Sequence, residues 1–320
     1  MANLKTTFLG IESPNPFWLA SAPPTDKAYN VNRAFEAGWG GVVLKTLGEE
    51  GPPIVNVSGP RYGAIHSNDR RVIGFNNIEL ITDRPLQTNL DEIRQIKKDW
   101  PDRAVVVSVM LPMNAEAWAK HLPMIEDTGC DAFELNFGCP HGMSERGMGA
   151  AVGQVPEYIP LATEWAKAAS SIPVIVKLTP NVASVVPPAT AAQEGGADAV
   201  SLINTINSNM RVNYDTLTMY PTTDGMGTHG GYCGEAVKPI ALNMVAEIAR
   251  NAATRSLPIS GIGGVTDWRD AVDFLALGAS NVQVCTAAMV YGVKMIDDLV
   301  DGRSTFLDDR GRTLAHLGGE

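Results

Sequence analysis

A cysteine lies where an apolar run of the chain gives way to a loop. In ELNFGCPHG, residues 134–142, Cys139 follows alternating apolar residues and precedes Pro140, His141 and Gly142, which end a strand. A thiol with a reference pKa near ~8.5 is mostly protonated at neutral pH yet able to exchange a proton. Cys139 is therefore a candidate general acid, with core filler and metal ligand as the alternatives. His141 either tunes it or hydrogen-bonds the loop.

Two lysines stand near the ends of other apolar runs, Lys45 in VVLKT and Lys177 in VIVKLTP. Burying an ammonium group without a partner is costly, so each lysine needs a carboxylate or a ligand nearby. Carboxylate partners are one interpretation. The other is that the lysines flank a group that becomes anionic during a reaction, as a reduced flavin does near N1 and O2. An aldolase that forms a Schiff base through Lys177 or Lys45 is a rival enzyme class.

Three asparagines have side chains suited to a cyclic amide. Asn77, Asn136 and Asn204 each offer a donor and an acceptor on one planar group, which matches the paired N–H and C=O groups of such a ring. For any one of them, capping a loop backbone is an equally good interpretation. The three together favour a shared ring-shaped ligand.

These residues are set in a repeating pattern of short apolar or β-branched runs, each followed by a stretch with helical spacing. Segments 116–129 and 268–278 repeat apolar residues every three or four positions and end at glycine, as helices do. Eight alternating units predict an α/β fold, the closed (β/α)₈ TIM barrel, with an open doubly wound sheet as the alternative. The runs span residues 17–23, 40–47, 104–110, 132–138, 174–180, 199–205, 258–264 and 281–287.

Two intervals between a predicted strand and the next helix, residues 48–86 and 206–234, are too long for simple turns. Long insertions in a compact domain are usually functional or disordered, and these two leave the C-terminal face of the barrel. The second has the Gly, Thr and Met content of a mobile lid. The N-terminal stretch predicts a β-hairpin around residues 13–15 that caps the bottom of the barrel. The whole chain, 1–320, is predicted to form one domain.

A barrel of this type gathers its chemistry at the C-terminal ends of its strands. Gly261, Gly263 and Gly264 in SGIGG, together with Thr286 in QVCTA, lie after the last two strands, where barrels often bind phosphate through backbone N–H groups. They indicate a phosphate-bearing cofactor, unless the glycines only permit a tight turn. A non-catalytic barrel that binds a phosphorylated metabolite is a further alternative. The strand-end residues are Ala20, Ser21, Lys45, Thr46, Asn136, Cys139, Lys177, Asn204, Thr205, Gly263, Gly264, Cys285 and Thr286.

The composition argues against several classes of partner. A formal charge of −10 without a basic block would repel phosphate backbones, so nucleic acid is not expected. Four scattered cysteines without C-x-x-C spacing predict reduced thiols and no metal site. Residues 225–230 match G-x-G-x-x-G but follow no strand closely, so a dinucleotide motif is not predicted. With no membrane-spanning run or signal peptide in view, a cytoplasmic location is expected.

Several stretches of the sequence, in order along most of the chain, match a known family: TTFLGIESPNPFWLASAP, VVLKT, NIELI, ELNFGCPHGMSERGMGAAVGQ, VIVKLTPN, INT, GGYCGEAVKPIAL, GIGG and VQVCTA. In these stretches the sequence resembles the flavin-dependent dihydroorotate and dihydropyrimidine dehydrogenases. The likeness is greatest to the pyrimidine-reducing domain of dihydropyrimidine dehydrogenase, including its bacterial catalytic subunit.

The resemblance implies FMN as cofactor and reduction of uracil or thymine to the 5,6-dihydro form. Hydride would pass from flavin N5 to C6, with Cys139 donating a proton to C5. Dihydroorotate oxidation, with Cys139 as the base, is the alternative; Glu79 would repel the carboxylate of that substrate, which favours a neutral pyrimidine. The implied substrate contacts are Asn77, Glu79, Asn136, Asn204 and Thr205. The implied FMN contacts are Ala20, Ser21, Lys45, Thr46, Lys177, Gly231, Gly263, Gly264, Cys285 and Thr286.

The chain departs from the family pattern at two residues. Gly138 and Cys233 stand where the family usually carries serine. The sequence ends at Glu320 before any cysteine-rich, ferredoxin-like tail of the kind that similar family members carry. Either the sequence is a shortened form, or an electron-donating partner subunit, a ferredoxin-like protein or a soluble donor is expected to reduce the flavin. By the same resemblance the protein is expected to be a homodimer.

Overall fold

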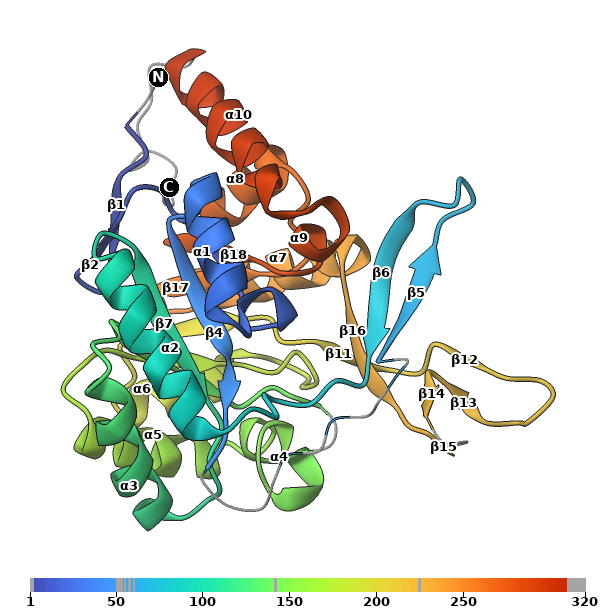
Figure 1. Ribbon diagram of the computed structural model, residues 1–320, viewed down its shortest axis with the longest axis horizontal. Coiled ribbons are helices and arrows are strands. Elements are labelled where there is room, and N and C mark those ends of the chain that lie inside the picture. The colour runs from blue at the N-terminus through green and yellow to red at the C-terminus, as the bar shows by residue number, and fades with distance from the viewer. Residues whose placement is uncertain are drawn as a thin grey trace.

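The computed structural model describes residues 3–49, 54, 56, 59, 61–140, 143–223 and 226–309 (Figure 1). The predictions for His141, and those that involve Gly142 and Gly225, lie outside the described residues.

A closed barrel of eight parallel strands forms the centre of the molecule, in the order β10-β17-β18-β3-β4-β7-β8-β9. Each strand lies within one of the eight predicted runs, so the predicted (β/α)₈ barrel is confirmed, and the open sheet is excluded. The strands are β3 (Phe17–Leu19), β4 (Gly41–Leu47), β7 (Ala104–Val109), β8 (Ala132–Asn136), β9 (Val174–Lys177), β10 (Ala199–Leu202), β17 (Ile259–Ile262) and β18 (Asn281–Val284).

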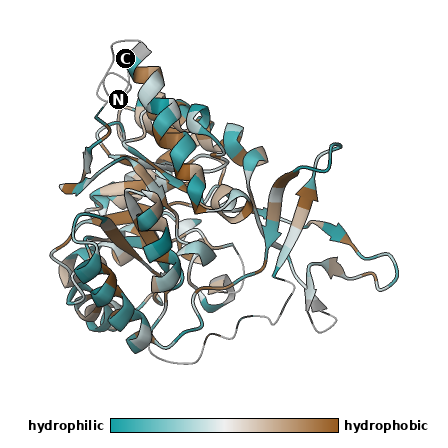
Figure 2. Ribbon diagram, turned by 45° about the horizontal axis from the view of Figure 1, so that its top comes forward, coloured by the Kyte–Doolittle hydropathy of each residue, from teal (hydrophilic) through white to brown (hydrophobic). Residues whose placement is uncertain are grey.

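Helices surround the barrel, with apolar residues toward the strands and polar residues outward (Figure 2). Sequence-local signals set some boundaries: Asn114 Oδ1 accepts from the Glu116 N–H at 2.9 Å, and Asp267 caps the helix that follows it. Within the described residues, no helix has the length and apolar character needed to span a bilayer. The α-helices are α1 (Ala28–Ala37), α2 (Leu86–Asp99), α3 (Ala115–Glu126), α4 (Ala150–Gly153), α5 (Tyr158–Ala169), α6 (Val186–Glu194), α7 (Lys238–Arg250), α8 (Trp268–Ala276), α9 (Thr286–Tyr291) and α10 (Ile296–Asp309). Short 3₁₀ turns are η1 (Pro23–Thr25), η2 (Met143–Arg146), η3 (Glu235–Val237) and η4 (Val293–Met295).

The predicted N-terminal hairpin is present as β1 (Thr6–Phe8) and β2 (Ile11–Ser13), but its turn is not at residues 13–15. The turn is Leu9-Gly10, both with positive φ, as two-residue hairpin turns require. Phe8 is buried and packs edge-on against Trp18 at 5.7 Å between ring centroids. The hairpin thus covers the end of the barrel at which the strands begin, as predicted.

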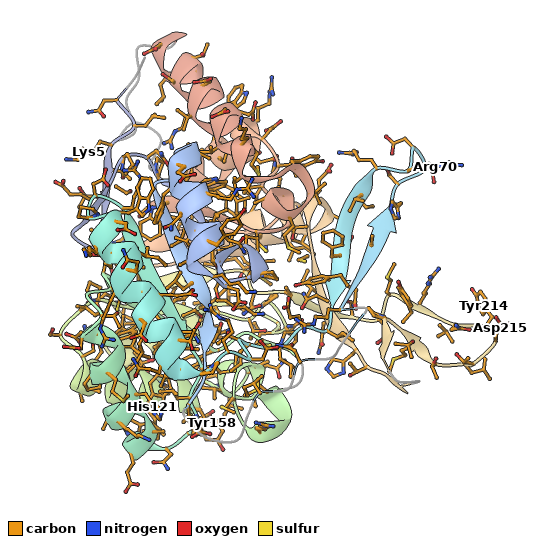
Figure 3. The ribbon with its side chains drawn as sticks, viewed as in Figure 1. Lys5, Arg70, His121, Tyr158, Tyr214 and Asp215 are labelled. Atoms are coloured by element: carbon orange, nitrogen blue, oxygen red, sulfur yellow. The ribbon has the colours of Figure 1, made fainter. Side chains whose placement is uncertain are left out.

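The two long insertions pair with each other. β5 (Tyr62–His66) and β6 (Val72–Asn77) come from the first, β11 (Ile206–Ser208) and β16 (Gly230–Cys233) from the second, and they form one antiparallel sheet in the order β11-β16-β6-β5. The second insertion also contains two separate two-stranded sheets: β12 (Arg211–Val212) with β13 (Met219–Tyr220), and β14 (Thr222–Thr223) with β15 (Met226–Gly227). Both parts project from the barrel (Figure 1), with Arg70 and Tyr214 marking their tips (Figure 3). The sequence predicted the insertions but not their pairing.

One cation is buried where helix α10 meets the barrel. Arg303 has no solvent-exposed surface, and none of its guanidinium nitrogens has a hydrogen-bond partner among the described residues. Its guanidinium carbon lies 5.4 Å from the centroid of the Phe17 ring, a cation–π contact that offsets part of the desolvation cost. Burial lowers the pKa of Arg303 to about 9.

We expect Arg303→Met to raise the free energy of unfolding at pH 7 by about 1–3 kcal/mol, because a buried polar group without a partner is removed. Between pH 9 and the ordinary arginine pKa, the unfolded wild-type chain binds more protons than the folded one. Wild-type stability should therefore rise with pH relative to Arg303→Met, and the gap should close. Urea unfolding between pH 7 and 10 measures both effects. Arg303→Lys, which keeps the charge, is the control; a loss of stability in Arg303→Met at pH 7 contradicts the prediction.

Candidate active site

A cavity that is partly open to solvent lies at the C-terminal ends of the barrel strands. Of the residues predicted for the site, all except Gly231 line it. Those residues are Ala20, Ser21, Lys45, Thr46, Asn77, Glu79, Asn136, Cys139, Lys177, Asn204, Thr205, Gly263, Gly264, Cys285 and Thr286.

Gly231 lies one layer behind the cavity wall, in β16. Its carbonyl accepts a hydrogen bond from Asn77 Nδ2 at 3.1 Å. A Cβ at this position would stand 2.1 Å from Thr205 Oγ1, so only glycine lets β16 approach the end of β10 so closely. Gly231 thus supports two lining residues, Asn77 and Thr205, and its own backbone is not part of the lining.

Gly263 and Gly264 form the turn after β17, with φ of 133° and 75°. A Cβ on Gly263 would stand 2.8 Å from Ala241 Cβ, and one on Gly264 would stand 2.7 Å from Lys238 Cβ. The glycines are therefore required by a tight turn and by close packing on helix α7, which was the structural interpretation left open by the sequence. Their backbone still lines the cavity, where its polar groups can face a ligand.

Lys45 is paired with a carboxylate inside the cavity. Its Nζ lies 2.7 Å from Glu79 Oε1, and Arg61 donates to the same oxygen at 3.2 Å. The Tyr62 hydroxyl donates to Glu79 Oε2. Burial, and then the charge of Glu79, raise the pKa of Tyr62, so the phenol stays protonated as a donor. Two cations offset the charge of Glu79, which weakens the expectation that it repels a substrate carboxylate.

Lys177 is paired with a carboxylate below the cavity. Glu134 has no exposed surface, and its Oε1 accepts from Lys177 Nζ at 3.3 Å. Its Oε2 accepts from Ser201 Oγ at 2.8 Å and from Gln283 Nε2 at 3.2 Å. Gln283 Oε1, on the cavity lining, has no hydrogen-bond partner among the described residues. Both lysines thus have the carboxylate partners that one sequence interpretation proposed, and both still line the cavity.

The asparagine side chains form a continuous polar chain along one wall. Asn204 Nδ2 donates to Asn136 Oδ1 at 2.9 Å, and Asn136 Nδ2 donates to Thr46 Oγ1 at 3.0 Å. Thr46 in turn lies 3.2 Å from Ser21 Oγ. Each amide keeps a second N–H for a ligand, and the network fixes the orientation in which it presents that donor. Asn136 Oδ1 already accepts from Asn204 and from the Gly138 N–H. Asn204 Oδ1, in contrast, accepts from the Thr205 N–H and keeps one lone pair. Asn77 lies on a different wall, in the insertion sheet.

Cys139 lines the cavity and is partly buried. It packs against an apolar cluster of Ile81, Met110, Met143 and Met148. This contact keeps its side chain at the cavity wall. Among the described residues, no group of three or more His, Cys, Asp and Glu side chains is arranged to hold a metal ion.

The other thiols lie in different surroundings. Cys130 is buried in the core, and burial raises its pKa to about 12, as expected for a filler. Cys233 and Cys285 line the same cavity as Cys139. Burial raises the pKa of Cys285 to about 12 and also raises that of Cys233. These two thiols therefore stay protonated at neutral pH and act as small packing groups of the wall.

The lining suits a polar ring with a phosphate-bearing tail. Lys45 and Lys177 supply cations to the lining, and the buried Gln283 Oε1 is an acceptor without a partner among the described residues that a ring N–H would satisfy. The glycine turn after β17 adds backbone to the lining. A nucleotide-like cofactor meets each of these features.

Sequence reasoning missed three residues of this region: Tyr62, Glu134 and Gln283. Lys45 was predicted because it is a polar residue at the end of an apolar strand. Glu134 in AFELNFG and Gln283 in NVQVCTA are also polar residues in apolar strands, but they lie before the strand ends. Tyr62 lies in the first insertion, where no periodicity marks it. Its place became apparent only from the pairing of β5 with β6.

Comparison with known proteins places these features in a family. The profile of the family described as "Dihydroorotate dehydrogenase" matches residues 3–307. The chain is 42% identical to "Dihydropyrimidine dehydrogenase (NADP(+)), chloroplastic" of Arabidopsis thaliana, over 91% of this chain and 70% of that protein. It is 38% identical to the NAD-dependent dihydropyrimidine dehydrogenase subunit PreA of Escherichia coli, over 97% and 74%. The catalytic subunit of dihydroorotate dehydrogenase B from Pyrococcus abyssi is 34% identical, over 96% and 95%.

Gly138 leaves no room for a side chain. A Cβ there would stand 2.4 Å from Asn204 Cβ, while the Gly138 N–H donates to Asn136 Oδ1 at 3.2 Å. We expect Gly138→Ala to lower the free energy of unfolding by about 1–3 kcal/mol, through overpacking against Asn204. Urea unfolding measures it.

The control is a double-mutant cycle with Asn204→Gly, which removes the opposing Cβ. The cost of Gly138→Ala should fall in the Asn204→Gly background. Equal costs in the two backgrounds would show that the contact with Asn204 is not the cause.

Proposed function

Because this chain belongs to the dihydroorotate dehydrogenase family, an oxidoreductase family of flavoproteins, we propose that it binds FMN and reduces the C5–C6 double bond of a pyrimidine. The observation that carries the proposal is the convergence of Cys139, two lysines and three asparagines on one cavity at the barrel rim. These are the residue types that a flavin and a cyclic amide require. The two insertions and the barrel would act as one FMN-binding unit.

In this proposal different parts of the lining have different tasks. Lys45 and Lys177 would supply cations beside the flavin ring, and the turns after β17 and β18 would offer backbone groups to its phosphate. Bound FMN would supply a hydride from N5 to C6 of the pyrimidine. The FMN contacts are Ala20, Ser21, Lys45, Thr46, Lys177, Gly263, Gly264, Cys285 and Thr286, with Gly231 supporting them from behind Asn77 and Thr205.

The substrate ring would be held by amides. Asn136 and Asn204 are already oriented by their mutual hydrogen bond, so they lose little freedom on binding a ring. Asn77, Glu79 and Thr205 would complete the contacts, with Glu79 fixed by Lys45, Arg61 and Tyr62. Uracil and thymine carry the N–H and C=O groups that such a set recognises.

Cys139 would complete the reaction. Its Sγ–H gives a proton to C5 as the hydride arrives at C6, and the resulting thiolate regains a proton from solvent. In the reverse direction the thiolate takes the C5 proton. The thiol needs no metal for this step, only a position at the cavity wall, which its contact with the apolar cluster provides.

Dihydroorotate oxidation and Schiff-base aldol chemistry are the two alternative functions. Oxidation of dihydroorotate is favoured by one observation: Lys45 and Arg61 offset the charge of Glu79, so a substrate carboxylate is not strongly repelled. The greater identity to the two dihydropyrimidine dehydrogenases supports the neutral pyrimidine. A Schiff-base aldolase lacks support, because both lysines are ion-paired and therefore poor nucleophiles.

The electron source belongs to the proposal as well. Two of the similar proteins are subunits by name, so we propose that a partner subunit, or a ferredoxin-like protein, delivers electrons to the flavin. We also propose that the chain forms a homodimer, as the resemblance suggested. Co-purification and light scattering test these two points.

Cys139→Ala should retain FMN and lose pyrimidine reduction by ~10²–10⁴-fold, the usual cost of removing a general acid. Stopped-flow reoxidation of photoreduced enzyme by uracil measures the rate, and the flavin spectrum reports binding. Cys130→Ala, a buried cysteine away from the cavity, is the matched control and should keep the rate. Unchanged turnover in Cys139→Ala would remove this thiol from the mechanism.

A panel of ring compounds separates the two pyrimidine reactions. Reduced enzyme should be reoxidised rapidly by uracil or thymine and slowly by orotate, because the site is proposed to fit a neutral ring. Anaerobic mixing followed by absorbance near ~450 nm provides the measurement. The opposite order assigns the protein to dihydroorotate oxidation. A folded protein that is colourless and takes up no FMN contradicts the proposal as a whole.

A further inference from the structure

We infer that Glu134 is a positioning residue that sets how much positive charge Lys177 presents to the flavin, and so tunes the reduction potential of the cofactor. The inference rests on the proposed FMN site and goes beyond it. It concerns a residue that does not line the cavity and would touch neither substrate nor cofactor.

Glu134 occupies the interior of the barrel, in β8, directly below the cavity floor. It is completely buried, and three donors from three other strands converge on it: Lys177 of β9, Ser201 of β10 and Gln283 of β18. Gln283 is held in turn by Ser260 Oγ at 2.8 Å. Because the donors sit on a closed sheet, the carboxylate has almost no freedom to move away from the lysine.

The two lysine–carboxylate pairs of the site differ in geometry. Glu79, the partner of Lys45, lines the cavity and is shared with Arg61, which also lies 3.9 Å from Asp83. Glu134 is fully buried and does not line the cavity, whereas Lys177 does, and Lys177 is the only cation that the described residues pair with Glu134. The electrostatic potential in the cavity near Lys177 is therefore the sum of a positive contribution from the nearby ammonium group and a smaller negative contribution from the more distant carboxylate.

A buried pair of this kind acts on redox equilibria. A reduced flavin carries negative charge near N1 and O2, which a nearby ammonium group stabilises and a nearby carboxylate opposes. Because Lys177 and Glu134 are both buried, salt screens their interactions only weakly. Glu134 thus has two effects: it fixes the position of Lys177 Nζ and it lowers the net positive potential there. Removing only the charge of Glu134 should favour the reduced cofactor.

The test measures midpoint potentials of the FMN-loaded full chain by dye-coupled reductive titration. Glu134→Gln, which keeps the shape and an acceptor oxygen, should raise the reduced-to-oxidised ratio at fixed potential at least tenfold, which is about 30 mV for a two-electron couple. Lys177→Gln should shift the potential downward. The double variant Glu134→Gln with Lys177→Gln should lie close to wild type. Glu194→Gln, an exposed glutamate on α6, is the matched control and should leave the potential unchanged.

The outcomes are distinct. If wild-type protein binds no FMN, the proposed function fails and this inference fails with it. If wild type binds FMN but Glu134→Gln leaves the potential unchanged or lowers it, the inference alone is wrong and Glu134 has only a structural role. If Glu134→Gln does not fold, the midpoint potential of the double variant is compared with that of Lys177→Gln alone. A higher potential in the double variant supports the inference, and equal potentials in the two variants overturn it.

Discussion

Closure of the parallel sheet is the constraint on which the site depends. With eight strands running in the same direction around one axis, their carboxyl ends meet at one rim, and side chains far apart in the chain become neighbours. Asn136 and Asn204 are separated by two strand and helix units and 68 positions of the chain, yet they hydrogen-bond at 2.9 Å. The rim therefore concentrates polar groups that no single segment could gather, over an apolar body that holds them in place.

The same closure forces charge into the interior, where it must be compensated. Glu134 is tolerated because a lysine, a serine and a glutamine on three other strands of the barrel donate hydrogen bonds to it. The mouth differs, because Glu79 arrives from the first insertion, and the sheet that holds that insertion contains a strand of the second. The barrel thus contributes Glu134, which pairs with Lys177, and the first insertion contributes Glu79, which pairs with Lys45.

Periodicity predicted the barrel because each strand is a short apolar run between helical segments, and the strand-end rule then found Lys45, Lys177 and Asn136. Other features depend on contacts that period and composition do not encode. Pairing of β16 with β6 joins residues 154 positions apart, such as Asn77 and Gly231. The hairpin turn was misplaced because Pro14 is a strong local turn signal, whereas the chain turns at Leu9, which rarely adopts positive φ.

The two carboxylates of the site belong to different parts of the chain, Glu79 to the first insertion and Glu134 to the barrel strand β8. A substitution in the first insertion can alter Glu79, Arg61 or Tyr62, and thereby the charge offered to a substrate, without touching the barrel interior. A substitution at Glu134 must preserve a network across four strands. The carboxylate that lines the cavity is thus carried on an insertion, and the carboxylate behind the lining is locked in the core, so a substitution can change the first while the network around the second stays intact.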